Sequence, residues 1–458
     1  MTSFDTAGLD HRALAVLRES TSGAVVLPGD PGYEAAHTVY GTTYGQSSAP
    51  ALVVQVADAE DVRLAVAFAR DNGLVLSVRS GGHSGSGFST NVGGLVIDLR
   101  RLNEVEVLDR NSGLVRIGAG AVWGDVATTL GAKGLALSSG DTVSVGVGGL
   151  TLGGGIGWLV RQYGLALDSL VEASVVTASG EHLRASSDEN ADLFWAIRGG
   201  GGNFGVITSF TFEAHPLAGV VAGTLRYGDD DLSTALTGWR DVMRVAPEEL
   251  NTTFLAMPDF PGMPGGVQIL VAYAATDAAE ADAAIAPLRA LPGFQGDDIS
   301  SRAYADLLEE AHPPEGMLIV GHNAFARVFD DDTIAAVARM YTELGGSVLM
   351  IRSLTGAFQR VPNDATAFGF RDSEVLLISV AFFPPDTPAE ATDRVRGLWG
   401  EVEPHLTGTY AGFSSAPDGE DPALLYPPDT LARLVEVKRK YDPANLFRRN
   451  HNIRPVAG

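Results

Sequence analysis

One histidine stands among residue types that suit cofactor chemistry. His83 lies in the stretch SVRSGGHSGSGFST, residues 77–90, flanked by glycines and hydroxyl side chains. The preceding run GLVLSV is apolar and β-branched, which predicts a short buried strand. The glycines that follow permit a tight, irregular turn. We therefore expect His83 to lie on a loop that leaves the end of a strand.

Glycine is concentrated close to this histidine. Of the 55 glycines in the chain, many fall in three clusters: SGGHSGSG at 80–87, GVGGLTLGGGIG at 146–157 and RGGGGNFG at 198–205. Glycine-rich turns let backbone N–H groups approach and surround a phosphate oxygen. One such cluster is more often a plain tight turn. Three clusters between residues 80 and 205 predict a pyrophosphate cradle.

The third cluster also satisfies a weaker motif. GGGNFG at 200–205 fits the G-x-G-x-x-G expression of Rossmann dinucleotide-binding proteins, which need a strand before the motif and a helix after it. Here DLFWAIR precedes the motif and the strand-like VITSFTFEAHP follows it. This context disfavours a Rossmann NAD site.

Composition narrows the chemistry further. The chain has no cysteine, which excludes disulfides, thiolate metal sites and a thiol nucleophile. Its nine histidines form no i,i+4 pair and no H-E-x-x-H motif, so we expect no metal site. The formal net charge of −24 repels a phosphate backbone, so no nucleic-acid partner is expected. Demanding chemistry is therefore expected to depend on an organic cofactor.

The same inspection gives expectations about location. The apolar run VLLISVAFF at 375–383 is far too short to cross a bilayer, so no membrane partner is expected. The first residues lack the basic-then-apolar pattern of a secretion signal, and a cytoplasmic location is the default expectation. The sequence does not indicate an oligomeric state.

At 458 residues the chain is long enough for two domains. The first part, to about residue 215, predicts strands at 51–56, 74–78 and 94–102, a strand pair within 105–120, and helices at 58–73 and within 125–140. The pattern is α+β rather than regularly alternating. From 216 to 407, helices such as 277–291 separate strand-like runs at 265–274 and 374–383. The stretch 431–456 predicts a helix, a turn at YDPAN and an extended tail.

Four long motifs are similar to one known family. RSGGHSGSG, SSGDTVSVGVGGLTLGGGIGWLVRQYGLALDSL, DENADLFWAIRGGGGNFGVITSFTF and YDPANLFRRNHNI together resemble the berberine-bridge-enzyme-like flavoproteins, which have the vanillyl-alcohol-oxidase type of FAD fold. The resemblance covers nearly all of 28–215 and about 400–455. It implies a two-part FAD-binding domain, 1–215 with 408–458, and a substrate domain, 216–407, whose antiparallel sheet is covered by helices.

The resemblance also assigns residues to the cofactor. It implies that His83 is bonded covalently to the 8α-methyl group of FAD, and that its loop neighbours contact the pyrophosphate. A histidine that only hydrogen-bonds within the turn is the alternative. The expected cofactor-binding residues are Arg79, Ser80, Gly81, Gly82, His83, Ser84, Gly85, Gly140, Thr142, Val145, Gly146, Gly148, Gly149, Gly157, Gly205, Val206, Ile207 and Asn450.

Two positions of the second cluster bear on reactivity. Many relatives carry a cysteine, with a second bond to flavin C6, at the position of Thr142; a hydroxyl does not readily replace a thiolate, so a single tether is expected. Val145 aligns with a gating position where a small side chain accompanies reaction with dioxygen. The alternative for Val145 is a β-branched residue packed in a strand.

The implied function is an FAD-dependent oxidase. It would take hydride from a CH–OH or CH–N bond of a small molecule, such as a sugar, alkaloid or secondary metabolite, and reduce dioxygen to hydrogen peroxide. A flavin dehydrogenase and a non-catalytic flavin-binding protein are the alternatives.

The catalytic base is harder to assign. Relatives often have a Y-x-N element where this chain reads YAGF, so Tyr410 matches and Gly412 replaces the asparagine. Tyr410 is the candidate catalytic residue, with a structural tyrosine near the flavin as the alternative. His322 and Arg352 are expected to be solvated or structural.

Overall fold

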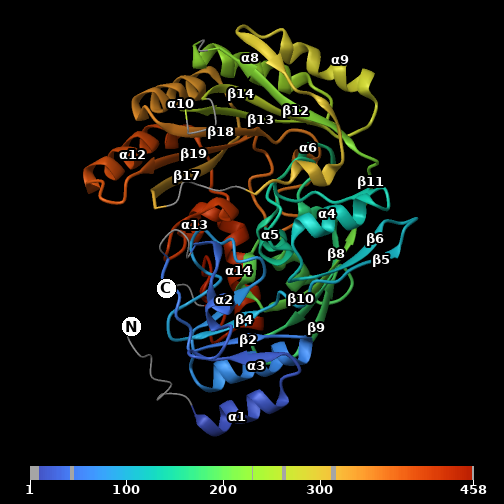
Figure 1. Ribbon diagram of the computed structural model, residues 1–458, viewed down its shortest axis with the longest axis vertical. Coiled ribbons are helices and arrows are strands. Elements are labelled where there is room, and N and C mark those ends of the chain that lie inside the picture. Colours follow the sequence, from blue (N-terminus) through green and yellow to red (C-terminus); the bar gives the residue numbers. More distant parts are fainter. Residues whose placement is uncertain (1–9, 42–45, 229–230, 260–264, 311–315, 456–458) are drawn as a thin grey trace.

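The computed structural model describes residues 10–41, 46–228, 231–259, 265–310 and 316–455. Three main sheets organise it (Figure 1). The fold is α+β, as predicted, with two sheets and the C-terminal segment in a lower part and one large sheet with its helices in an upper part.

The first sheet carries the His83 loop. Its strand order is β1-β2-β4-β3, with β2, β4 and β3 parallel and β1 antiparallel. The connection from β2 to β3 runs through α3, so this part does contain a parallel unit within the α+β fold. The bounds are α1 His11–Ser20, β1 Ala24–Val26, α2 Tyr33–His37, β2 Leu52–Gln55, α3 Ala59–Asp71, β3 Leu76–Arg79 and β4 Leu95–Asp98.

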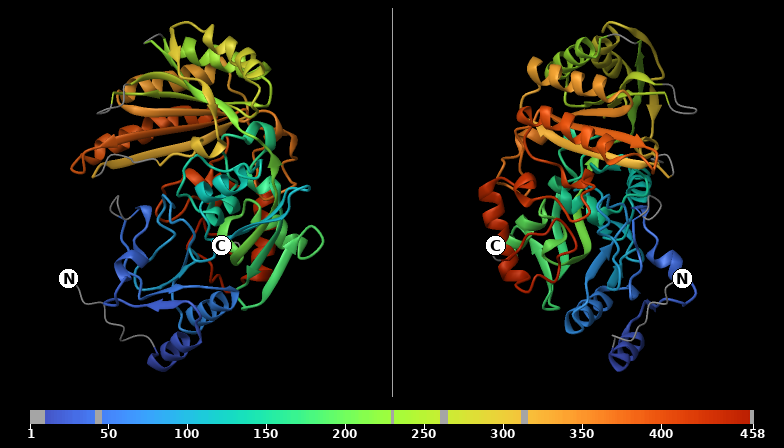
Figure 2. Two further views of the ribbon diagram at one scale, coloured as in Figure 1. Left: turned by 45° about the vertical axis from the view of Figure 1, so that its right-hand side comes forward. Right: turned by 90° about the vertical axis from the view of Figure 1, so that its left-hand side faces the viewer.

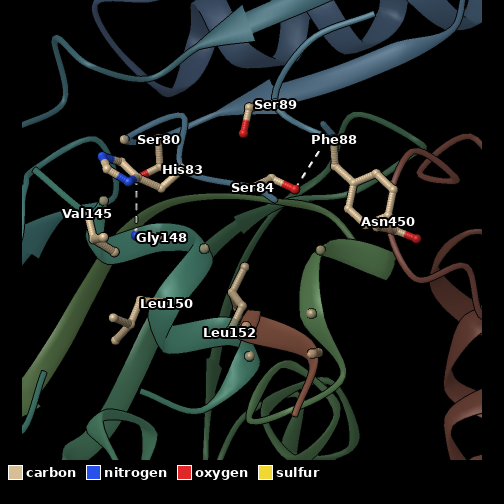
Figure 3. Close-up of a pocket in the computed structure, with 18 of the residues that line it drawn as sticks. Ser80, His83, Ser84, Phe88, Ser89, Val145, Gly148, Leu150, Leu152 and Asn450 are labelled. Atoms are coloured by element: carbon tan, nitrogen blue, oxygen red, sulfur yellow. Dashed lines mark hydrogen bonds between the residues drawn. The ribbon is translucent and has the colours of Figure 1, made fainter. Parts of the chain in front are cut away.

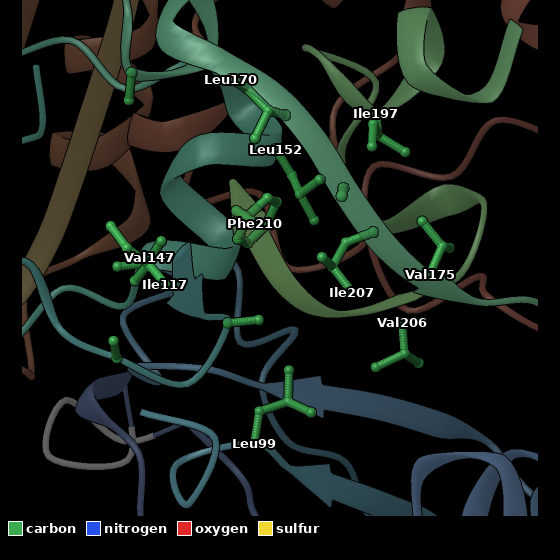
Figure 4. Close-up of a cluster of buried hydrophobic side chains, with 14 of the residues drawn as sticks. Leu99, Ile117, Val147, Leu152, Leu170, Val175, Ile197, Val206, Ile207 and Phe210 are labelled. Atoms are coloured by element: carbon green, nitrogen blue, oxygen red, sulfur yellow. The ribbon is translucent and has the colours of Figure 1, made fainter. Parts of the chain in front are cut away.

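The second sheet is antiparallel, in the order β5-β6-β10-β8-β9. Its apolar face and the first sheet share one core, part of which is drawn in Figure 4. The bounds are β5 Val105–Asp109, β6 Leu114–Gly118, α4 Trp123–Gly131, β7 Leu135–Ala136, α5 Val147–Gly153, α6 Val160–Tyr163, β8 Leu170–Val176, β9 His182–Ser186, α7 Ala191–Ile197, β10 Val206–Glu213 and β11 His215–Pro216.

The third sheet has eight antiparallel strands, seven in the order β15-β12-β14-β13-β18-β19-β17, with β16 also paired to β12. Helices α8, α9, α10 and α12 cover its outer face, as Figures 1 and 2 show. The bounds are β12 Val220–Tyr227, α8 Leu232–Val245, β13 Leu250–Met257, β14 Gly266–Tyr273, α9 Ala278–Arg289, β15 Phe294–Asp297, β16 Ser300–Arg302, β17 Leu318–Ala326, α10 Asp331–Leu344, β18 Ser347–Ser353, α11 Ala357–Arg360, β19 Val375–Phe383 and α12 Ala389–Val402.

Successive side chains of a strand point to opposite faces of the sheet, and this alternation determines which residues lie on the inner face. Leu349 and Ile351 of β18 pack in the core under the helices, whereas Met350 and Arg352 face the lower part of the molecule. Arg352 pairs with Thr253 of β13 and with Leu376 of β19 in the strand register. The inner face thus brings side chains from three strands together.

The chain then returns to the lower part through α13 Pro422–Leu425 and α14 Pro428–Tyr441. Lys438 and Asp442, both fully buried, form an ion pair of 2.7 Å at the end of α14. The ammonium group of Lys438 also donates to the carbonyls of Asn203 and Phe447. These bonds fix residues 442–453 beside the third glycine cluster.

Two predictions about local structure can be checked here. Helix α7 precedes GGGNFG and strand β10 follows it, the reverse of the Rossmann order, so the prediction against that motif is confirmed. Val145 lies in an irregular turn and not in the strand that its alternative assumed, although its side chain does pack against the main core.

Candidate active site

A cavity of about 640 Å³ lies where the glycine clusters, the inner face of the large sheet and the C-terminal segment meet. This volume falls in the range of roughly 300–1,000 Å³ that is typical of small-molecule and cofactor sites. Figure 3 shows part of the lining, with His83, Ser84 and Val145 near the glycine loops and Asn450 on the C-terminal segment.

The structure brings most of the predicted residues to this cavity. Those that line it are Ser80, Gly81, Gly82, His83, Ser84, Gly85, Gly140, Thr142, Val145, Gly146, Gly148, Gly149, Gly205, Val206, Ile207, Tyr410 and Asn450.

Two predicted residues lie outside the lining. Arg79 is 6% exposed and donates to the carbonyl of Ala36. Its burial, aided by the nearby Arg100, lowers its pKa to about 10. At Gly157 a side chain would collide with the Ser139 carbonyl, so this glycine serves close packing behind the cavity wall.

The first two glycine clusters touch backbone to backbone. A Cβ at Gly81 would fall on the amide of Gly146, and one at Gly146 would fall on the amide of Gly81. Ser80 ties the same loops together, because its Oγ donates to the Ala119 carbonyl at 2.6 Å and accepts from the Gly148 amide at 3.2 Å (Figure 3). Only glycine permits this approach, which explains the glycines at positions 81 and 146.

His83 lies in a half-buried polar setting. Its ring stacks on Tyr40 with centroids 4.6 Å apart. Its Nε2 lies 2.7 Å from the Oγ of Ser144, and that hydroxyl also lies 2.7 and 2.6 Å from the two carboxylate oxygens of Glu310. Burial lowers the pKa of His83, an effect that Glu310 partly opposes. The imidazole is therefore neutral at neutral pH.

Tyr410 lies on the wall formed by the C-terminal segment and is 4% exposed. Its phenol oxygen accepts a hydrogen bond of 3.1 Å from the Gly155 amide, so its own O–H remains able to donate. Burial raises the pKa of Tyr410 to about 12. A phenol with this pKa is protonated at neutral pH and is a poor base.

Next to Tyr410, Arg352 and Asp141 form a bidentate ion pair with distances of 3.0 and 2.6 Å. The Arg352 guanidinium is also 3.0 Å from the Thr253 hydroxyl and lies over the Trp158 ring. Arg352 is thus buried and paired and not solvated, which agrees with the structural half of the expectation, and its side chain also lines the cavity. His322, by contrast, lies outside the lining and stacks on Trp399.

The C-terminal segment supplies a cation and an amide. Arg449 lines the cavity and donates to the carbonyls of Gly87 and Thr90, beside the ring of Phe88. The side-chain oxygen of Asn450 is buried, lines the cavity and accepts no hydrogen bond from the described part of the chain. The unsatisfied acceptor suits a ligand that offers an O–H or N–H donor, whereas the guanidinium suits a phosphate oxygen.

Sequence reasoning missed Asp141, Ser144, Glu310 and Arg449. The first two lie inside a quoted glycine motif and Arg449 stands beside Asn450, so position in the motif was the available signal. Glu310 has none, because only folding brings it to residues 144 and 83.

The lining fits FAD. Side chains at Gly149 and Gly202 would meet no protein atom, so glycine at these positions leaves room for an occupant. Serine hydroxyls, the neutral imidazole of His83 and apolar side chains such as Leu150 and Leu152 face the same cavity (Figure 3). The described residues contain no group of three or more His, Asp or Glu side chains that could hold a metal ion. Within them no helix is long and apolar enough to span a bilayer.

A glycine-lined cavity closed by a separate antiparallel sheet is the architecture of FAD-linked oxidases of the vanillyl-alcohol-oxidase type. Two family models match the chain, "FAD binding domain" over residues 50–186 and "Berberine and berberine like" over residues 422–454. The chain belongs to the berberine-bridge-like family of FAD-linked oxidoreductases.

Individual relatives agree with this assignment. The chain is 31% identical to (R)-6-hydroxynicotine oxidase of Paenarthrobacter nicotinovorans, over 95% of this chain and 97% of that protein. The crystal structure of 6-hydroxy-D-nicotine oxidase from Arthrobacter nicotinovorans matches with a TM-score of 0.83 and 29% identity, covering 95% and 99% of the two chains. Glucooligosaccharide oxidase of Acremonium strictum, which holds a 6-S-cysteinyl, 8α-N1-histidyl FAD, matches with a TM-score of 0.84 and 24% identity over 97% and 100%.

Proposed function

We propose that this enzyme is an oxidase whose FAD is attached covalently through His83 alone. It takes hydride from a CH–OH or CH–N bond of a small molecule and reduces dioxygen to hydrogen peroxide. Bound flavin supplies the hydride acceptor. The observation that carries the proposal is the convergence of His83, Asp141 and Tyr410 on one cavity.

The protein's own groups bind and orient the substrate. Each oxygen of Asp141 accepts one N–H from Arg352, so a lone pair on each stays available for an O–H or N–H of the substrate. The Tyr410 hydroxyl donates from the neighbouring wall. Met350, Leu376 and Ile378 supply an apolar surface beside these groups and exclude water. This arrangement suits a compact, largely apolar molecule with one hydroxyl or amine at the reacting carbon.

A single tether is supported by the residue at position 142. Thr142 lines the cavity at the position where the resemblance places a cysteine, and the chain contains no cysteine at all. Acid precipitation of the wild type should leave yellow colour in the pellet. His83→Ala should release all of its flavin into the supernatant. Colour that remains in the His83→Ala pellet would contradict the single attachment.

The oxidase assignment has its own test. A screen of small alcohols, amines and sugars for peroxide release identifies a substrate, and anaerobic reduction followed by air then measures reoxidation. Rapid reoxidation with peroxide release supports the oxidase. Slow reoxidation would indicate a dehydrogenase, and a flavin that no substrate reduces would indicate a carrier protein.

A further inference from the structure

Three side chains form a continuous hydrogen-bonded row beside the cavity. The row runs from His83 Nε2 to Ser144 Oγ and on to the carboxylate of Glu310, with every step between 2.6 and 2.7 Å. Of these three residues, only His83 has a part in the proposed function. Ser144 and Glu310 are not among the residues that line the cavity.

The chemistry of the three groups settles where the protons lie. A carboxylate only accepts hydrogen bonds, so the single proton of Ser144 is directed to Glu310. The Ser144 oxygen must then accept from His83, which places a proton on Nε2. The other ring nitrogen, Nδ1, consequently keeps its lone pair. The row therefore holds His83 in the tautomer whose Nδ1 is the nucleophile.

The row is not a hydrolase triad. In that arrangement histidine lies between serine and acid and takes the proton of the serine. Here serine lies between histidine and acid, and its proton is already committed to Glu310. Ser144 therefore passes a proton on and does not attack a substrate.

We propose that Ser144 and Glu310 are positioning residues for covalent attachment of the flavin, which carry the Nε2 proton away as Nδ1 bonds to the 8α carbon. The inference rests on the proposed linkage through His83. It adds the groups that make this imidazole reactive and the route that its proton takes.

Attachment conserves atoms and electrons. A C–N bond forms between Nδ1 and the 8α carbon, while one C–H bond of the 8α-methyl group and the Nε2–H bond break. The electron pair of the C–H bond reduces the isoalloxazine ring by two electrons, and the proton of that bond passes to the reduced ring. The Nε2 proton moves to Ser144 as the Ser144 proton moves to Glu310. Dioxygen, the oxidant of the proposed function, then takes the two electrons together with these two protons and becomes hydrogen peroxide.

Glu310, the third residue of the row, lies on a segment of the substrate domain. The amide of Glu309 donates to the Asp141 carbonyl at 3.0 Å, and the amide of Val143 donates to the Glu309 carbonyl at 3.3 Å. This pairing holds Glu310 over Ser144. Both bonds use the backbone of Glu309, whereas its side chain is exposed. Glu309 therefore offers a matched control for Glu310.

The experiment follows attachment over time in the full-length protein. Protein made under riboflavin limitation is mixed with FAD, samples are quenched in acid, and flavin in the pellet is measured. Ser144→Ala and Glu310→Gln should attach flavin roughly 10²-fold more slowly than the wild type, the lower end of the range for loss of a base. The concentration of FAD that gives half-maximal binding should not change. Ser144→Thr, which keeps a hydroxyl, should restore the rate, and Glu309→Gln should match the wild type.

The outcomes separate the two proposals. Flavin retained in the pellet by His83→Ala would overturn the linkage itself. Loss in His83→Ala together with wild-type rates in Ser144→Ala and Glu310→Gln would overturn the row alone. An equal slowing in Glu309→Gln, or slow attachment in Ser144→Thr, would also overturn it, since both would show a general disturbance of the loop. If Glu310→Gln does not fold, the pair Ser144→Ala and Ser144→Thr decides.

Discussion

Burial of the Tyr410 hydroxyl determines whether this residue can take a proton from the substrate or only donate a hydrogen bond to it. Its raised pKa, about 12, leaves about one molecule in 10⁵ ionised at pH 7. As the candidate catalytic residue, Tyr410 could deprotonate the substrate or orient it, and this environment favours orienting. A donated hydrogen bond to the substrate is worth about 1 kcal/mol when both partners are neutral.

We therefore expect Tyr410→Phe to load flavin normally and to be reduced by substrate roughly tenfold more slowly. The group stays protonated as pH rises until its folded pKa is approached, so the wild-type rate should show no phenol ionisation between pH 7 and 10. Anaerobic stopped-flow reduction of both proteins across this range measures both effects. A loss of 10³-fold or more, with a phenol ionisation in the wild-type profile, would return Tyr410 to the role of base.

Val145 allows a second test at the scale of one residue. It lines the cavity in a turn between Thr142 and Gly146, and added volume in a packed site costs about 1–3 kcal/mol. If dioxygen approaches the flavin past this side chain, Val145→Leu should slow reoxidation roughly tenfold or more. The rate of flavin reduction by substrate should change much less. To measure reoxidation, the flavin is first reduced with dithionite and then mixed with air-saturated buffer.

Val143→Leu provides the control, because Val143 belongs to the same turn but is 37% exposed and lies outside the cavity lining. Equal reoxidation rates in all three proteins would show that position 145 does not gate dioxygen.

At the scale of elements, the short helix Ala411–Phe413 explains a departure from the family pattern. A Cβ at Gly412 would lie 2.7 Å from ring carbons and 2.8 Å from the hydroxyl of Tyr410. The tyrosine ring thus occupies the space that a side chain at position 412 would need. The observed orientation of Tyr410 therefore requires glycine at position 412.

Gly412→Ala should therefore displace the Tyr410 ring and slow substrate reduction at least as much as Tyr410→Phe, roughly tenfold. Flavin attachment should be retained because His83 lies on another loop. Gly397→Ala in α12, where a Cβ meets no other atom, controls for the substitution itself. Full activity in Gly412→Ala would mean that the ring does not need its observed position.

Helix α14 carries a prediction about stability. Lys438→Met leaves the buried Asp442 without its cation, and breaking a buried pair from one side costs about 3–5 kcal/mol. Lys440→Met on the same helix removes an exposed pair with Asp192, a change worth about 1 kcal/mol or less. Urea unfolding of both variants measures the two losses of stability. Similar midpoints would contradict the structural importance of the buried pair.

The local sequence pattern was sufficient to predict many of the helices and strands. The helix predicted at 277–291 is observed as Ala278–Arg289, which is rich in alanine and is capped by Asp277, and the strand-like run 265–274 is observed as Gly266–Tyr273. The local pattern did not predict the structure of the second glycine cluster. Residues 147–153 form the helix α5, although glycine lowers helix propensity. Packing of α5 in the main core overrides that preference.

At the scale of the whole molecule, the site divides into what motifs reveal and what only tertiary structure reveals. His83 and the glycines could be found because their motif is contiguous. The Asp141 and Arg352 pair joins residues 211 positions apart, and Glu310 reaches Ser144 across 166 positions. Such contacts depend on how the large sheet is placed over the glycine loops, which no local period encodes.

The return of the chain to its first domain has a consequence for biogenesis. Phe447, Arg449 and Asn450 complete a wall that otherwise consists of residues synthesised earlier, and the Ile453 amide donates to the side chain of Asn203. A nascent chain that has been exposed only up to α14 lacks this part of the wall. We therefore expect stable capture of the flavin to follow translation of residue 453, and messages that stop before it should yield colourless protein.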